Sequence, residues 1–115
     1  MSIVELDREE SAVLSPLNPE QQIIFNAECY MREHGWCRHH LHNMAGEVCI
    51  VGALTFGSVE SHNQAWLNTI TIIEDALGGR GEDDMSPIPR WNDNVCKDEE
   101  EALAFLQRMR ELATR

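Results

Sequence analysis

Lysine is almost missing from this chain of 115 residues, and all its lysines and arginines together number 9 against 20 aspartates and glutamates. The formal net charge is −11 at pH 7. Direct binding to nucleic acid depends on cationic side chains that displace counterions from phosphate groups. The shortage of cations therefore argues against a nucleic-acid partner and against an anionic membrane surface, and it favours a basic protein partner. The simpler interpretation is that the charge provides solubility.

Long apolar runs are also missing. The longest uncharged apolar stretch covers residues 48–59, which is far short of the ~20 residues that a membrane-spanning helix needs. The N-terminal sequence MSIVELDREES is acidic, whereas a secretory signal begins with a basic and then an apolar segment. The four cysteines form no CxxC pair, which is typical of reduced thiols. We therefore expect a cytoplasmic protein without membrane contact.

The size and composition favour one small helical domain. A chain of this length fits a single domain, and its content of 43% apolar and 25% charged residues is ordinary for a globular protein. We expect residues 1–17 to form an N-terminal arm that is loosely attached. Residues 18–115 are expected to form a single domain of mainly α class, a bundle of three to four helices with an alternative short β-hairpin at 36–51.

The first predicted helix covers residues 19–34. Asn18 can cap it, Pro19 suits the first helical position, and Gln21 completes the capping-box spacing. Apolar side chains then recur at helical spacing. Gly35 is a typical stop signal.

Two further helices are predicted nearer the C-terminus. The first covers roughly residues 61–77, follows Ser58 and Ser61, and ends at a glycine pair. The other begins at Asp98, where Glu101 completes a capping box. The segment between them is predicted to be a loop over 78–89 followed by a short link. The expected buried positions are Trp66, Ile70, Ile73 and Leu77 in one helix, and Ala102, Phe105, Leu106, Met109, Leu112 and Ala113 in the other.

Residues 36–57 fit two structures. A β-hairpin about a turn at 43–46 is favoured by the β-branched residues of the segment EVCIVGAL. A short buried helix is the alternative for the second half, because Cys49, Gly52, Ala53 and Phe56 share one helical face. The residues alone leave both structures open.

Reactive side chains gather between Cys37 and Cys49. In a hairpin, His42 would face Glu47 and His40 would face Cys49 on one side of the ribbon. Imidazole, thiolate and carboxylate groups at such distances are ligands for zinc. Our main expectation is no cofactor, with histidines at the surface and cysteines in the core. The alternative is a zinc site formed by His40, His42 and Cys49.

A thiol-dependent site is another alternative. Cys37 lies close in sequence to His39, His40 and His42, and Asn92 or Asp93 could orient an imidazole. These are the parts of a cysteine nucleophile site. No pattern places a thiolate at a helix N-terminus, where its pKa would fall.

The sequence Trp91-Asn92-Asp93 has two interpretations. In the structural one, the indole fills one side of the core and the polar side chains bond to the backbone of a turn. In the functional one, Trp36 and Trp91 form the walls of a small polar pocket that receives a ligand or a partner's side chain. The candidate binding residues are Trp36, Cys37, His39, Cys49, Trp91, Asn92 and Asp93.

The order of three short motifs resembles an uncharacterised family of small, mostly actinobacterial and phage-encoded proteins. The motifs are GWC at 35–37, CxxGAL at 49–54 and WND at 91–93, and the resemblance covers residues 20–112. The long 78–89 loop and the histidine run at 39–42 are not features of that pattern. The resemblance implies that the CxxGAL segment is helical, that Gly52 permits close helix approach, and that the three motifs share one structural centre.

The leading functional hypothesis is a non-enzymatic interaction protein, encoded by a phage and acting on a host protein through an acidic surface. The interaction role rests on the charge, the small size and the lack of a complete catalytic constellation, whereas the phage origin is what the resemblance implies. The alternative is a metal- or thiol-dependent site around Cys37, His40, His42 and Cys49. Self-association is compatible with either hypothesis.

Overall fold

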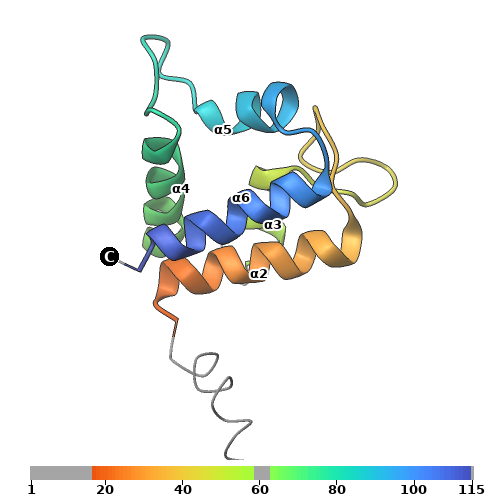
Figure 1. Cartoon of the computed structure of the whole chain (residues 1–115), viewed down its shortest axis with the longest axis horizontal. Helices are drawn as coiled ribbons and strands as arrows, with labels where there is room; N and C mark the ends of the chain where they lie inside the picture. Colours follow the sequence, from red (N-terminus) through yellow and green to blue (C-terminus); the bar gives the residue numbers. More distant parts are fainter. Residues whose placement is uncertain (1–16, 59–62, 115) are drawn as a thin grey trace, which may run out of the picture.

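Two antiparallel helices form the body of the molecule (Figure 1). The computed structural model describes residues 17–58 and 63–114. Helix α2 spans Pro19–His34 and helix α6 spans Glu99–Leu112. The start of α2 contacts the end of α6, where Asn18 Nδ2 donates a hydrogen bond of 2.7 Å to the Ala113 carbonyl oxygen. The mainly α fold class predicted from the sequence is confirmed. The predicted N-terminal arm lies outside the described residues except for Leu17.

Helix α2 begins and ends as its sequence predicts. Asn18 Oδ1 accepts a hydrogen bond of 2.7 Å from the Gln21 amide, and Gln21 Oε1 accepts one of 3.0 Å from the Asn18 amide. These two bonds form the capping box. Gly35 ends the helix with a φ of 96°, a backbone conformation that glycine adopts without strain.

Helix α6 also starts at its predicted cap. Asp98 Oδ1 accepts a hydrogen bond of 2.9 Å from the Glu101 amide. Phe105 is buried as expected. Leu112 is 41% exposed, so its predicted place in the core is wrong. Ala113, the next residue, is buried in the core, so Leu112 lies on the side of this last turn that faces away from it.

Helix α4 spans Gln64–Ala76 and starts later than predicted, because Asn63 caps it. Asn63 Oδ1 accepts a hydrogen bond of 2.9 Å from the Trp66 amide. Trp66 and Ile73 are buried as expected, whereas the expected core residues Ile70 and Leu77 are only half-buried. Ser61, which we expected before this helix, lies outside the described residues.

The predicted hairpin at 36–51 is wrong, and the helical alternative for its second half is confirmed. Helix α3 spans Ile50–Phe56. Residues 36–49 form an irregular loop in which Val48 makes isolated bridges with both Trp36 and His42. Val48 is fully buried in the core, and its backbone pairs with two different parts of the loop, so the segment does not extend into a flat ribbon.

Residues 87–95, which follow the acidic loop at 78–86, are helical. The prediction of a loop that reaches residue 89, followed by a short irregular link, is therefore wrong for these residues. Helix α5 spans Pro87–Arg90 and continues into a π-helical turn, η1, over Trp91–Val95. The Cys96 amide donates a hydrogen bond of 2.9 Å to the Trp91 carbonyl oxygen, which gives the wide turn. Ile88 is fully buried and fixes this segment to the core.

The core lies where α2, α3, α4 and α6 meet. Each helix buries one face and exposes the other, as expected for a small helical domain. No helix in the described part of the chain combines the length and the apolar character required to cross a membrane. The residues with no exposed surface include Ile24, Ala27, Met31, Ile50, Ala53, Leu54, Ile73, Ile88, Ala102 and Leu106.

Two buried carboxylates each accept two hydrogen bonds from one guanidinium group. Arg110 on α6 donates to both oxygens of Glu28 on α2, at 2.6 and 3.1 Å. Arg80 donates to both oxygens of Glu74, at 3.0 and 2.9 Å. Because a charge removed from water is costly without a partner, these bidentate pairs offset the cost of burying Glu28 and Glu74.

We expect Arg110→Met to lower the free energy of unfolding by about 3 kcal/mol, because Glu28 would be left buried without its bidentate partner. Urea denaturation measures the change. Arg32 is the matched control, since it lies 3.9 Å from Glu28 and its side chain is 55% exposed. Arg32→Met should cost less than about 0.5 kcal/mol. Adding Glu28→Gln to Arg110→Met should recover much of the loss, and no recovery would contradict the explanation.

Candidate functional site

The side chain of Asn92 connects the three sequence motifs. Asn92 Oδ1 accepts hydrogen bonds from Trp36 Nε1 at 2.8 Å and from the Ile50 amide at 3.1 Å. Its Nδ2 donates to the Cys37 carbonyl oxygen at 3.2 Å and to Asp93 Oδ1 at 2.9 Å. Asn92 has no exposed surface, and these bonds use the whole hydrogen-bonding capacity of a carboxamide. One side chain therefore holds the loop, the start of α3 and the π turn together.

Asp93 fixes the loop at a second point. Its Oδ1 accepts a hydrogen bond of 2.8 Å from the His39 amide, and its Oδ2 lies 3.4 Å from His39 Nδ1. His39 has a φ of 69°, a left-handed conformation that non-glycine residues seldom adopt. Burial alone would raise the pKa of Asp93, but the hydrogen bonds from His39 and Asn92 outweigh it and lower the pKa. The carboxylate is therefore charged at neutral pH.

The two tryptophans near Asn92 face different partners. Trp91 stacks on Phe105 of α6 with 4.3 Å between ring centroids. The indole of Trp36 lies under the guanidinium of Arg38, which is 4.9 Å from the ring centroid. These contacts favour the structural interpretation of the WND motif over a pocket between the two indoles.

Gly52 of the CxxGAL motif lies against the backbone of the loop. A Cβ atom at this position would be 2.0 Å from the Leu41 carbonyl oxygen, so no other residue fits without a shift of the loop. The close approach that the resemblance implied is thus present. Its partner is the loop and not another helix.

The three buried thiols lack the properties of a nucleophile. Cys49 Sγ accepts a hydrogen bond of 3.3 Å from the Gly52 amide and caps α3. Cys37 Sγ lies within hydrogen-bond distance of the His40 and Glu47 carbonyl oxygens, at 3.5 and 3.4 Å. Burial raises the pKa of Cys37 and of Cys49, and that of Cys96 to about 11. Thiols of this kind are protonated and weakly reactive at neutral pH.

The alternative zinc ligands do not form one site. Among residues 17–58 and 63–114, no group of three or more His, Cys, Asp or Glu side chains could hold a metal ion. The ring of His42 packs edge-on against Phe56, with 5.1 Å between centroids. Cys49 is occupied as the cap of α3. The zinc prediction depended on the register of the hairpin, and that hairpin is replaced by a loop around Val48.

Comparison with known proteins confirms that the chain belongs to an uncharacterised family, whereas the motif pattern stays a prediction. The chain matches a family of unknown function, DUF6197, over residues 15–112. The chain belongs to this family. No curated protein matches it, and no solved structure does. The association of the family with actinobacteria and phages stays a prediction.

A hollow of about 250 Å³ opens beside Asn92 in this DUF6197 member. Its volume is slightly below the range of roughly 300–1,000 Å³ that is typical of drug-sized ligands. Its walls come from the loop, from α3 with its cap residue, and from α5 and η1. They consist of His39, His40, Leu41, Cys49, Val51, Pro89 and Asp93.

Apolar side chains are also exposed in the loop and at the end of α3. Met44 is fully exposed, Leu41 is 52% exposed and Phe56 is 43% exposed. We call Leu41, His42, Met44 and Phe56 the loop surface. Sequence reasoning selected the histidines and missed Leu41 and Met44, although two apolar residues inside a polar, histidine-rich run were a visible signal.

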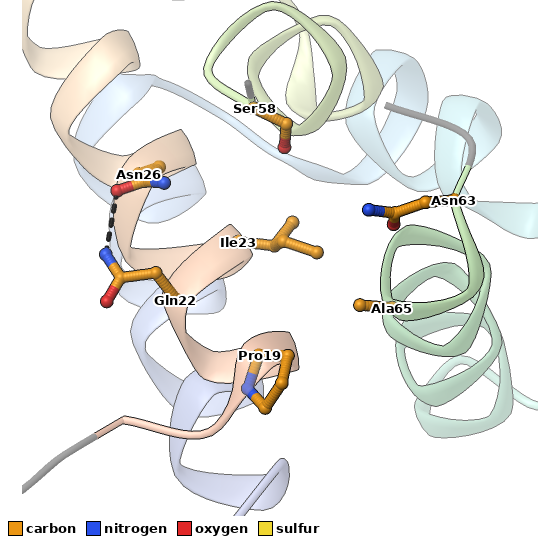
Figure 2. A pocket seen from close by; sticks show the side chains of 7 residues that line it. All are labelled: Pro19, Gln22, Ile23, Asn26, Ser58, Asn63 and Ala65. Carbon is orange, nitrogen blue, oxygen red and sulfur yellow. Dashed lines mark hydrogen bonds between the residues drawn. The ribbon is translucent and has the colours of Figure 1, made fainter. Parts of the chain in front are cut away.

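A second hollow of about 280 Å³ lies between α2, the end of α3 and α4 (Figure 2). Ile23, Pro19 and Ala65 give it apolar walls, and the other lining residues are uncharged polar side chains. Gln22 Nε2 donates to Asn26 Oδ1 at 3.0 Å, and Ser58 Oγ donates to the Leu54 carbonyl oxygen at 2.8 Å. The lining residues in the described part of the chain include no ionisable group.

We expect Asn92→Ala to destabilise the protein by about 3 kcal/mol or more. The substitution would leave the Trp36 indole N–H, the Ile50 amide and the Cys37 carbonyl oxygen without their partner, and each such group costs about 1–3 kcal/mol. Urea denaturation measures the effect. Asn94, exposed in the same π turn, is the matched control, and Asn94→Ala should change stability by less than about 0.5 kcal/mol. Similar effects of both variants would disprove the role of Asn92.

One cysteine per chain should react quickly with an aromatic disulfide reagent at pH 8. Cys29 is exposed on α2, whereas Cys37, Cys49 and Cys96 are buried. The raised pKa of the buried thiols further reduces their thiolate fraction. Absorbance of the released thiol gives the number of fast sites. In Cys29→Ser the fast phase should disappear, and a remaining fast phase would indicate an activated thiol.

Proposed function

We propose that this protein is a non-catalytic protein-binding module whose contact site is the loop surface. The observation that carries this proposal is the contrast between the two sides of the loop. Its inner side is fixed by Asn92 and Asp93 through hydrogen bonds of 2.8–3.2 Å. Its outer side exposes Leu41 and Met44. Apolar side chains on a fixed frame need little ordering when a partner binds, which favours affinity.

The charge distribution supports a basic partner. Of the few cationic side chains, Arg80 and Arg110 are paired with buried carboxylates. Arg38 donates to the carbonyl oxygens of Cys96 and Lys97, at 2.8 and 3.2 Å. Because the ion pairs of Arg80 and Arg110 are each neutral, the whole net charge of −11 is carried by the other ionisable side chains. Such a field accelerates association with a cationic protein, and it weakens with salt.

The state of the thiols supports a binding role over a thiol-dependent reaction. A nucleophilic cysteine needs a lowered pKa, whereas burial raises the pKa of both Cys37 and Cys49. A cytoplasmic location, a phage origin with a host target, and self-association stay predictions that accompany this proposal.

Site-specific photo-crosslinking tests the proposal. A benzophenone amino acid replaces Met44 in one chain and Met85 in a control chain, since Met85 is 61% exposed but lies in the acidic loop far along the sequence. Irradiation in cells that naturally contain the protein should give one discrete adduct from position 44 and none from position 85. The adduct yield in lysate should fall as salt rises.

The Leu41→Asp variant serves as the second control in this experiment. Leu41 is 52% exposed, so the substitution should change stability by less than about 0.5 kcal/mol. It should nevertheless abolish the adduct from position 44. The same adducts from positions 44 and 85, or no adduct from position 44, would show that the loop surface is not a binding site.

A further inference from the structure

Asp93 differs from the two buried glutamates in its ionic partner. Glu28 and Glu74 each receive two hydrogen bonds from a guanidinium group within the chain. The Asp93 side chain is 22% exposed, and its one ion-pair contact within the described ranges is an imidazole nitrogen at 3.4 Å. One carboxylate oxygen, Oδ1, is saturated by the amides of His39 and Asn92. The other, Oδ2, retains capacity to accept a hydrogen bond.

The hollow beside Asn92 gives access to this carboxylate. Asp93 lines it together with apolar side chains of Leu41, Val51 and Pro89. Neither lysine nor arginine is among its lining residues. The neighbouring Arg38 is directed elsewhere, to the Cys96 carbonyl oxygen at 2.8 Å. The hollow therefore combines a negative charge with apolar walls, and the described chain provides no guanidinium to fill it.

We propose that this hollow receives an arginine side chain of the partner protein, with its guanidinium on Asp93 and its methylene groups against Leu41, Val51 and Pro89. The inference rests on the proposed protein-binding function, because Leu41 belongs both to the hollow and to the loop surface. The volume of about 250 Å³ is below the usual range for a drug-sized ligand and is suited to a single side chain.

Arginine fits the lining better than other cationic groups. Its planar guanidinium can donate to Asp93 Oδ2, the oxygen that retains capacity, and it stacks on flat rings such as those of His39 and His40. A lysine ammonium is more strongly hydrated and would lose more on entering an apolar hollow. An anionic ligand would be repelled by Asp93.

Titration with N-acetyl-arginine amide, followed by nuclear magnetic resonance of the uniformly ¹⁵N-labelled full chain, tests the inference. The His39 amide is the reporter, because it donates to Asp93 Oδ1. Its signal should shift saturably with the arginine compound. N-acetyl-citrulline amide, a neutral isostere, should produce no saturable shift at the same concentrations.

Two variants locate the binding. Asp93→Asn keeps an oxygen that can accept from His39 and removes the charge, and it should raise the Kd at least tenfold. Val51→Phe fills the hollow without changing the carboxylate, and it should raise the Kd by a similar factor. This second variant keeps the inference testable if Asp93→Asn perturbs the fold. Equal shifts with citrulline, unchanged affinity in the folded variants, or shifts confined to 98–101 would overturn the inference.

The outcomes separate this inference from the proposed function. If position 44 crosslinks to a partner while the arginine compound does not bind, the loop surface is confirmed and the arginine site is wrong. If the arginine compound binds at Asp93 and no crosslink forms, the arginine site is confirmed and the contact surface must lie elsewhere.

Discussion

The carboxamide of Asn92 is the interaction on which the rest of this structure depends. It is buried between segments that are distant in sequence and bonds to each of them at 2.8–3.2 Å. A buried polar group with no partner is costly, whereas a fully satisfied one fixes a unique arrangement. The GWC, CxxGAL and WND motifs therefore act as one unit, in which the first contributes an indole and a carbonyl, the second a helix start, and the third the amide.

The position of the loop follows from this unit. Gly52 allows the Leu41 carbonyl to pass over the start of α3, and Val48 anchors the loop from within. Asp93 holds the backbone of His39 in a left-handed conformation. Because these contacts fix the backbone on the inner side of the loop, they also determine that Leu41 and Met44 are exposed on its outer side. This is the physical basis for considering the loop a presented surface.

Charge acts at two levels in the molecule. Inside, Glu28 and Glu74 are neutralised by guanidinium groups, because two-point hydrogen bonding offsets the loss of hydration. Outside, the other ionisable side chains carry the whole net charge of −11, because each internal pair is neutral. Asp93 lies between these two levels, partly buried and paired only with an imidazole in the described ranges. A surface with this distribution is complementary to a cationic protein.

The sequence by itself determined the helices that carry their own start signals. Asn18 with Gln21, and Asp98 with Glu101, are local contacts between residues three apart, so the sequence pattern alone specifies them. The mainly α class followed from them. Only the tertiary structure decided the path of residues 36–49 and the helical turn at 91–95. Those segments are held by bonds to Asn92 and by the burial of Val48 and Ile88. Because these contacts join residues far apart in the chain, no local pattern could show which side chains would converge on Asp93 or which would face outward.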